Sequence, residues 1–345
     1  AHFPRWVLYF CTILLFVANV INISADLGAM AQATKLVLPG LNFTILVLGF
    51  TIFSLILQIF ISYEKFASFL KWLALILIAY VVTAFLVNVN WGEVAINTVV
   101  PRISLNKEMI ILIAAVLGTT ISPYLFFWQT SQEVEEEILE GKVTLTERKD
   151  STTDESIKKM RVDVWSGMFL SNIVMFFIIA TCAATLHQNG VTSINDAAQA
   201  AAALEPLAGK YAYLLFTLGI IGTGLLAVPV LAGSASYAIS ESFGWKQGLY
   251  RKLRQAYSFY GVIIIALLIG LAINFIGIDP IKALIFSAVV NAIVAPVVLV
   301  LIVILSSREK IMGERKNGWL TKITGSAITL IMIVTAVVTL VALAV

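Results

Sequence analysis

The chain has 345 residues, of which 60% are hydrophobic and only 12% are charged. Soluble domains carry about 25% charged residues, so this composition and a mean hydropathy of +0.96 indicate that most of the chain lies in lipid. A formal net charge of +3 supplies no basic surface for nucleic acid. The two cysteines, Cys11 and Cys182, lie in apolar runs, which argues against a disulfide framework or a cysteine-rich metal site.

Nine apolar runs are long enough to cross a bilayer, since a helix needs about 20 mostly apolar residues to span roughly 30 Å of hydrocarbon. In chain order, we expect membrane spans near 6–34, 41–63, 66–88, 108–130, 162–187, 209–240, 255–276, 281–306 and 322–345. No run alternates polar and apolar residues as a barrel strand would. The predicted fold class is therefore an all-α polytopic membrane protein.

The basic residues predict the orientation of these spans. If the spans alternate in direction, 18 of the 23 Lys and Arg residues fall on the side of residue 1 and 5 on the other side. Cytoplasmic loops carry an excess of Lys and Arg. We therefore expect residue 1 in the cytoplasm and residue 345 outside.

Asp26 is the one acidic residue that falls well inside a predicted span. An ionisable group at membrane depth costs at least ~2.5 kcal/mol and usually faces a cavity or a partner. Asp26 is thus a candidate for an ion or proton pathway. The alternative is that it caps or pairs with a polar neighbour near the outer end of a long first span.

The fourth span is interrupted near its middle by the sequence GTTISP at 118–123. Pro123 lacks an N–H and its ring clashes with the carbonyl four residues back, so we expect carbonyls around Gly118 to Thr120 to be released. Unwound backbone at this depth is tolerated only where it is buried or lines a cavity. The interruption favours unwinding over a simple proline kink. Asn291, followed by Pro296 in the eighth span, is a further candidate, either as a cation ligand or in an interhelical hydrogen bond.

A discontinuous span near the midplane is typical of transporters built from inverted repeats, whose broken helices bind the substrate. This pattern predicts three helices of a first repeat in 1–105, a five-helix second repeat in 106–306 and an extra span in 307–345. Two further spans would then precede Ala1. The glutamate-rich stretch 131–160 is interpreted as a solvated helical extension, and 188–207 as a small loop helix.

Four stretches of the chain resemble the NRAMP divalent-metal transporters, which have the leucine-transporter inverted-repeat fold. NISADLGAMAQA at 22–33 is similar to the third helix of that family, and GTTISPYLFFWQTSQ at 118–132 to its broken sixth helix. The segment 196–225 is similar to the connection into the eighth helix, and IFSAVVNAIVAP at 285–296 to the tenth. The resemblance implies that the chain covers helices three to eleven of eleven.

The departures from the family pattern imply a particular cation. Ser122 stands where the family usually has methionine, and Tyr124 and Gln129 stand where it usually has histidine. Ala29 replaces an acidic residue and Ala288 a glutamine. Loss of the soft thioether favours a hard cation held by oxygen ligands. The resemblance therefore points to the magnesium-transporting branch, with Mn²⁺ as a second substrate and weak or no proton coupling.

The predicted site combines these lines of argument. We expect metal ligands at Thr119 (through its carbonyl), Ser122 and Asn291, and pathway residues at Asp26, Tyr124 and Gln129. The family's remaining ligands, an Asp and an Asn, lie on the first broken helix, which is not in this chain. The expected partners are the divalent ion, the lipid bilayer and the missing N-terminal helices, with no cofactor beyond the transported ion and no nucleic acid. The expected location is a prokaryotic inner membrane.

Other functions stay open at this stage. A conventional proton-coupled Mn²⁺/Fe²⁺ transporter fits the same motifs, and a sodium-coupled amino-acid transporter shares the fold. A membrane-embedded enzyme is disfavoured, since no span carries an HExxH pair, a paired-aspartate motif or a Ser/Lys dyad. A metal sensor or scaffold without transport activity is a further alternative.

Overall fold

The computed structural model describes residues 3–61, 65, 68, 72, 78–87, 89–101, 106–187, 190–191, 194, 197–202, 209 and 212–344. Within these residues all regular structure is helical. Seven helices are long and apolar enough to cross a membrane, and Tyr257–Ile273 is a shorter apolar helix. The chain is thus an all-α membrane protein, as its composition predicts.

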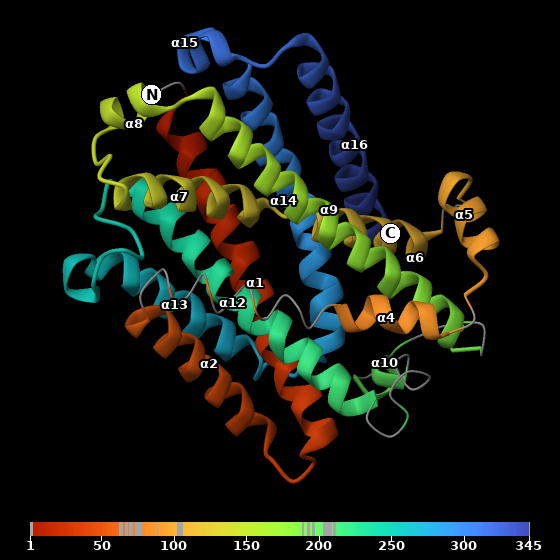
Figure 1. The fold of residues 1–345 in the computed structure, drawn as a ribbon. Coiled ribbons are helices and arrows are strands. Elements are labelled where there is room, and N and C mark those ends of the chain that lie inside the picture. The colour runs from red at the N-terminus through yellow and green to blue at the C-terminus, as the bar shows by residue number, and fades with distance from the viewer. Residues whose placement is uncertain are drawn as a thin grey trace.

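The helices follow one another through a single bundle (Figure 1). Their bounds are α1 Arg5–Val37, α2 Phe43–Phe60, α4 Ile78–Leu86, α5 Trp91–Val99, α6 Lys107–Thr120, α7 Pro123–Leu139, α8 Leu145–Ser151, α9 Asp154–Thr185, α10 Ala197–Ala201, α12 Ala212–Phe243, α13 Tyr257–Ile273, α14 Pro280–Ser306, α15 Glu309–Met312 and α16 Trp319–Ala344. Two short 3₁₀ turns lie at Leu253–Gln255 and Gly313–Arg315.

Most predicted spans have a matching helix, with shifted ends. The span predicted at 162–187 begins earlier, at Asp154, because Thr153 caps the helix ahead of its polar first turn. The fourth span continues beyond residue 130 to Leu139, so the extension expected there is helical. It is not solvated throughout, because Ser131, Gln132 and Glu135 are buried against the bundle. The span predicted at 66–88 lies mostly outside the described residues, apart from α4.

Helix α1 is the central element of the bundle. It packs against α12, α14, α13 and α2 (Figure 1), and its face toward α12 is rich in small or buried residues. Gly224 of α12 lets the two helices approach closely, because a side chain there would collide with Met30. Two side chains also bond across this contact, with Thr217 donating to the Ala33 carbonyl at 2.7 Å and Asn19 to the Leu231 carbonyl at 2.9 Å.

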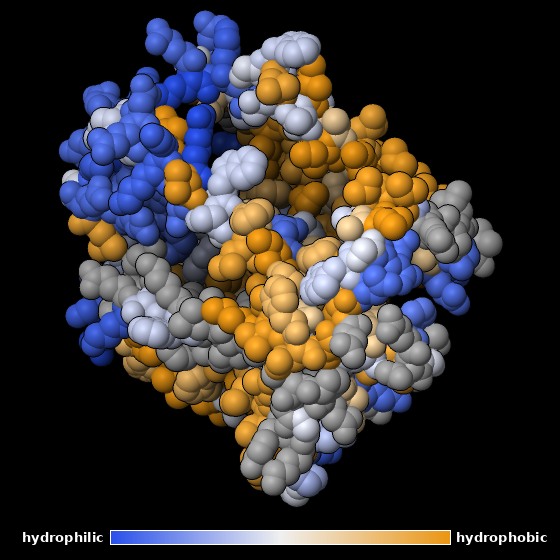
Figure 2. Space-filling view, turned by 45° about the vertical axis from the view of Figure 1, so that its right-hand side comes forward, coloured by the Kyte–Doolittle hydropathy of each residue, from blue (hydrophilic) through white to orange (hydrophobic). Residues whose placement is uncertain are grey.

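The outer faces of the helices are largely apolar, and the largest group of polar residues lies at one end (Figure 2). Figure 2 shows hydrophilic residues concentrated at the upper left, over the end of the molecule that carries α8. In Figure 1 the start of α1, the end of α7 and α15 lie toward the same end. We call this the polar end. It carries the loops that hold most of the basic residues, consistent with the asymmetry seen in the sequence.

Candidate metal site at the broken helix

The fourth span is broken between α6 and α7, at Ile121 and Ser122. The break is narrower than predicted, since Gly118 to Thr120 remain helical and the Ile121 N–H still donates to the Leu117 carbonyl at 2.8 Å. Pro123 begins α7, where its missing N–H causes no loss of a helical hydrogen bond. The proline therefore stops one helix and starts the next.

Ser122 satisfies the carbonyls that the break releases. Ser122 is 2% exposed, and its hydroxyl donates to the carbonyls of Gly118 and Thr119, both at 2.9 Å. Without this bond the Thr119 carbonyl would lack a donor, because the residue four positions further on is Pro123, which has no N–H. The Thr119 side chain is exposed, so its carbonyl, rather than its hydroxyl, is the group that faces the break.

Helix α14 lies directly against this break. Gly118 packs so closely on α14 that a Cβ there would collide with the Ala288 carbonyl and the Ala292 backbone. Pro296 lies inside α14 and cannot donate to the carbonyl of Ala292. The contact thus brings the Ser122 region and the neighbourhood of Asn291 together, each with carbonyls that have lost their usual helical donor.

Asn291 forms a reciprocal amide pair with Asn22 of α1. The Asn22 Nδ2 donates to Asn291 Oδ1 at 3.0 Å, and the Asn291 Nδ2 donates to Asn22 Oδ1 at 3.2 Å. Asn22 also donates to the Ala18 carbonyl at 2.8 Å. The interhelical hydrogen bond, one of the two alternatives predicted for Asn291, is therefore present. A cation bound at Asn291 Oδ1 would have to displace the Asn22 Nδ2 donor.

Asp26 lies one helical turn beyond Asn22 on the same face of α1. Its carboxyl is close enough to the Tyr124 hydroxyl for the two to interact electrostatically, and Tyr124 also contacts Ser122. Both Asp26 and Tyr124 are partly buried. Of the six predicted residues, Ser122 and Tyr124 therefore lie at the start of α7, with Asp26 within electrostatic range of Tyr124.

Gln129 lies farther along α7 and bonds within its own helix, donating to Glu133 Oε1 at 3.0 Å. Helix α12 supports this part of α7, because the Ser234 hydroxyl donates to the Tyr124 carbonyl at 2.9 Å. Ser234 and Asn22 are the two contacting residues that sequence reasoning did not place in the site. The spacing of Asn22 from Asp26, one turn on a helix, is the signal in the sequence that could have identified Asn22.

Oxygen atoms dominate this region. No group of three or more His, Cys, Asp or Glu side chains within the described residues is arranged to hold a metal ion. What the break offers instead is a serine hydroxyl, carbonyls of α6 and α14, and amide oxygens. Such ligands suit hard cations that keep part of their water shell.

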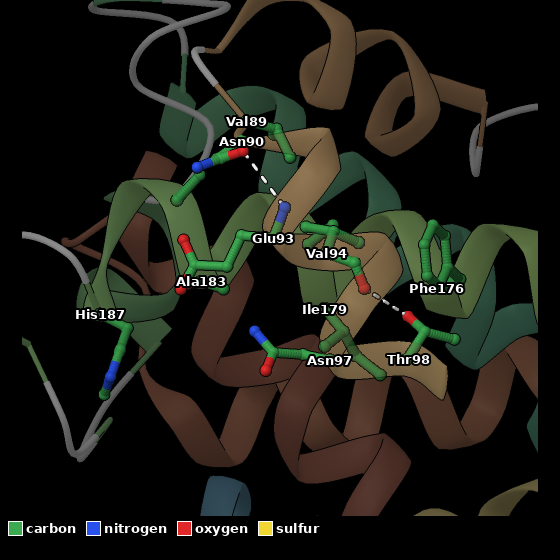
Figure 3. Close-up of a pocket in the computed structure, with 12 residues that line it drawn as sticks. Val89, Asn90, Glu93, Val94, Asn97, Thr98, Phe176, Ile179, Ala183 and His187 are labelled. Carbon is green, nitrogen blue, oxygen red and sulfur yellow. Dashed lines mark hydrogen bonds between the residues drawn. The ribbon is translucent and has the colours of Figure 1, made fainter. Parts of the chain in front are cut away.

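A separate pocket of about 570 Å³ lies between α5 and the end of α9 (Figure 3). Glu93, Asn97 and His187 line it together with mainly apolar side chains. Asn90 caps α5 by accepting from the Glu93 N–H at 3.2 Å. None of the six predicted site residues is among its twelve described lining residues, so this pocket is distinct from the broken helix.

Curated relatives match about three quarters of the chain. The chain is 26% identical over 262 residues to "Divalent metal cation transporter MntH" of Klebsiella pneumoniae (strain 342), covering 74% of this chain and 58% of the relative. It is 24% identical over 260 residues to the protein of the same name from Clostridium acetobutylicum, covering 75% of this chain and 55% of the relative. The chain thus spans somewhat more than half the length of these relatives.

A solved structure with the same fold is a manganese transporter of Eremococcus coleocola in complex with an aromatic bis-isothiourea substituted compound. It matches with a TM-score of 0.65 at 17% identity, over 99% of this chain and 72% of that one. The family model for natural resistance-associated macrophage protein-like proteins matches residues 1–342. The chain therefore belongs to the Nramp family, a family of membrane transporters and not of enzymes.

Proposed function

We propose that the protein containing this chain transports divalent metal cations across the membrane, with Mg²⁺ as its main substrate and Mn²⁺ as a second one. Family membership supports transport of a divalent cation. The observation that carries the choice of Mg²⁺ is the replacement of a soft ligand by Ser122, whose hydroxyl and bonded carbonyls are oxygen donors at the break.

Thr119, Ser122 and Asn291 are the proposed ligands of this chain, and Asp26, Tyr124 and Gln129 the proposed pathway. The ion would enter beside the Ser122 hydroxyl and compete with Asn22 for the Asn291 amide oxygen. Mg²⁺ binds with several of its waters in place, so a few such oxygens suffice. We further propose that 1–105 holds three helices of a first inverted repeat, that 106–306 is a five-helix second repeat and that 307–345 is an extra span. The two repeats would move against each other around this site, with residue 1 in the cytoplasm.

We propose weak or no proton coupling. The carboxylates and imidazoles that could relay protons are few around the break, where Tyr124 and Gln129 occupy the positions of two histidines in the family pattern. Asp26 is the acidic side chain that lies beside Tyr124. A conventional proton-coupled Mn²⁺ transporter is the second candidate, and its choice of metal is favoured by the name of the solved manganese transporter.

A metal-competition uptake assay on the intact protein in proteoliposomes tests this proposal. We expect Mg²⁺ uptake without acidification of the lumen, and competition by Mn²⁺. Ser122→Met should shift the preference toward Mn²⁺ by about tenfold, equal to about 1.4 kcal/mol. A matched control is Ser171→Met, because Ser171 is an exposed residue of α9. Strong Mn²⁺ preference with proton entry in the unaltered protein would contradict the proposal.

A further inference from the structure

We propose that Glu135 is a positioning residue for transport, which holds the far end of the broken helix's second half against α12 and the connection into α13. This inference rests on the proposed transport function. It concerns the polar end of α7 and not the metal ligands, since Glu135 is 13 residues from Ser122, a separation of about 20 Å along a helix.

Three donors from two other elements converge on the Glu135 carboxylate. The Tyr237 hydroxyl of α12 donates to Oε1, the Leu249 N–H donates to the same oxygen at 2.5 Å, and the Tyr250 N–H donates to Oε2 at 3.1 Å. Glu135 is only 2% exposed, and Arg251 lies within electrostatic range of it. A buried carboxylate is tolerated where donors of this kind satisfy it.

The chain between α12 and α13 is shaped to present these N–H groups. Gly248 has a φ of +121°, a conformation that L side chains rarely adopt, and a Cβ there would come within 2.9 Å of Glu135 Oε1. The following residues fold so that the Tyr260 hydroxyl donates to the Arg251 carbonyl at 2.7 Å. A glycine is therefore required where the backbone turns toward the carboxylate.

Helix α7 lies along α12 from the break to this point. Ser234 bonds to the Tyr124 carbonyl next to Ser122, and Gly233 leaves room for the Trp128 ring, which also meets the Tyr237 ring edge-on at 6.3 Å. The Glu135 contact is the last in this series and the one that adds a third element. A shift of α7 as a rigid helix would therefore require this contact to break or to move with it.

The consequence for transport follows from the position of the two ends of α7. Its first turn carries Tyr124 beside the proposed metal site, and its last turns carry Glu135. Because a helix transmits displacement along its axis, the Glu135 contact sets where Tyr124 lies relative to α1 and α14. Loss of the contact should loosen α7 and slow the transport cycle.

Thiol labelling and uptake kinetics on the intact protein test this inference. Ser131 is a buried residue of α7 that lines a cavity of about 240 Å³ next to Glu135. With Cys11 and Cys182 replaced by alanine, we place the probe by Ser131→Cys and measure its reaction rate with a membrane-impermeant methanethiosulfonate reagent. Glu135→Gln should raise the labelling rate at least about fivefold and lower the maximal Mg²⁺ uptake rate to a similar degree.

Two variants approach the same contact from its other sides. Tyr237→Phe removes the donor on α12, and Gly248→Ala forces the connection away from the carboxylate. Each should raise the labelling rate of the Ser131→Cys probe. When either is combined with Glu135→Gln, the combined effect should be smaller than the sum of the two separate effects. Glu136→Gln is the matched control on the exposed face of α7 and should stay within twofold of the parent.

Each outcome has a definite meaning. Unchanged labelling in folded Glu135→Gln protein overturns the inference, and so does faster labelling with normal uptake, which would make the contact purely structural. If Glu135→Gln does not fold, Tyr237→Phe decides by the same two measurements. If the parent protein moves no divalent ion, the proposed function fails, whereas the labelling rates still report whether Glu135 holds α7.

Discussion

The two ends of α7 lie among groups of different chemistry. At the break, neutral groups bond one another, with the Ser122 hydroxyl on two carbonyls and the Asn22 and Asn291 amides on each other. At the polar end, a buried carboxylate collects three donors from two elements. Neutral hydrogen bonds are worth roughly half as much as those to charged groups.

This difference suits a helix that must admit an ion at one end. Groups around an ion site have to exchange their protein partners for the ion, so their resting contacts should be easily replaced. The opposite end of α7 must stay in place while that exchange occurs. Asn291, near the break, is paired with one neutral amide. Glu135, at the polar end, accepts hydrogen bonds from α12 and from the connection into α13.

Disrupting the close packing at Gly118 should have the largest effect on the break while leaving the polar end of α7 unchanged. Gly118→Ala places a Cβ against the backbone of α14, and we expect it to lower the free energy of unfolding in detergent by about 2 kcal/mol. The matched control is Gly261→Ala in α13, where nothing lies within 4 Å of the new Cβ. That control should be neutral or slightly stabilising, because alanine is the better helix former by about 1 kcal/mol. Equal effects at both glycines would show that α6 and α14 do not need their close contact.

The sequence predicts the helices and the break better than it predicts their partners. Apolar length places most spans to within a few residues, except where capping by Thr153 lengthens α9 and where α7 continues to Leu139. Pro123 marks the break because its missing N–H is a local property. The break is narrower than the proline alone predicts, since the Ser122 hydroxyl bonds the carbonyls of Gly118 and Thr119 and both residues stay helical.

Contacts between distant helices lie beyond such reasoning. Asn22 and Asn291 are 269 residues apart, and a lone amide in an apolar helix does not reveal which other helix it faces. Glu135 is a stronger example, because it stands in a glutamate-rich stretch that is typical of a solvated helix. Its burial depends on Tyr237 and on the turn at Gly248, which only the folded chain brings to it.

A double-mutant cycle on the amide pair sharpens the comparison at the break. We expect Asn22→Ala and Asn291→Ala to show a coupling of about 0.6 kcal/mol in unfolding measurements, the average for side-chain hydrogen bonds between membrane helices. Asn291→Ala should weaken Mg²⁺ binding more than Asn22→Ala, because only Asn291 is a proposed ligand. A coupling of several kcal/mol would mean that the pair is too strong for an ion to displace.

Removing an exposed ion pair at the polar end should have the smallest effect on uptake. This change tests whether the role of Glu135 depends on its burial or whether any carboxylate at this end would serve. Lys316 donates to Glu309 Oε2 at 2.6 Å, and this hydrogen bond lowers the pKa of the Glu309 carboxyl below its usual range. The pair is therefore intact above the usual glutamate pKa of about 4.3 and is lost only as the pH falls through the lowered value. Between pH 5 and pH 8 the ratio of uptake rates of Glu309→Gln and parent protein should stay flat and within twofold of one.

Arg315→Gln serves as a parallel control, since its pair with Asp154 is also exposed. A large loss in Glu309→Gln would mean that negative charge anywhere at the polar end supports transport. The role inferred for Glu135 would then not depend on its burial. If the ratio for Glu309→Gln is flat and near one while Glu135→Gln has a large effect, the difference is explained by the surroundings of the two glutamates, because only Glu135 is enclosed by donors from α12 and the connection into α13.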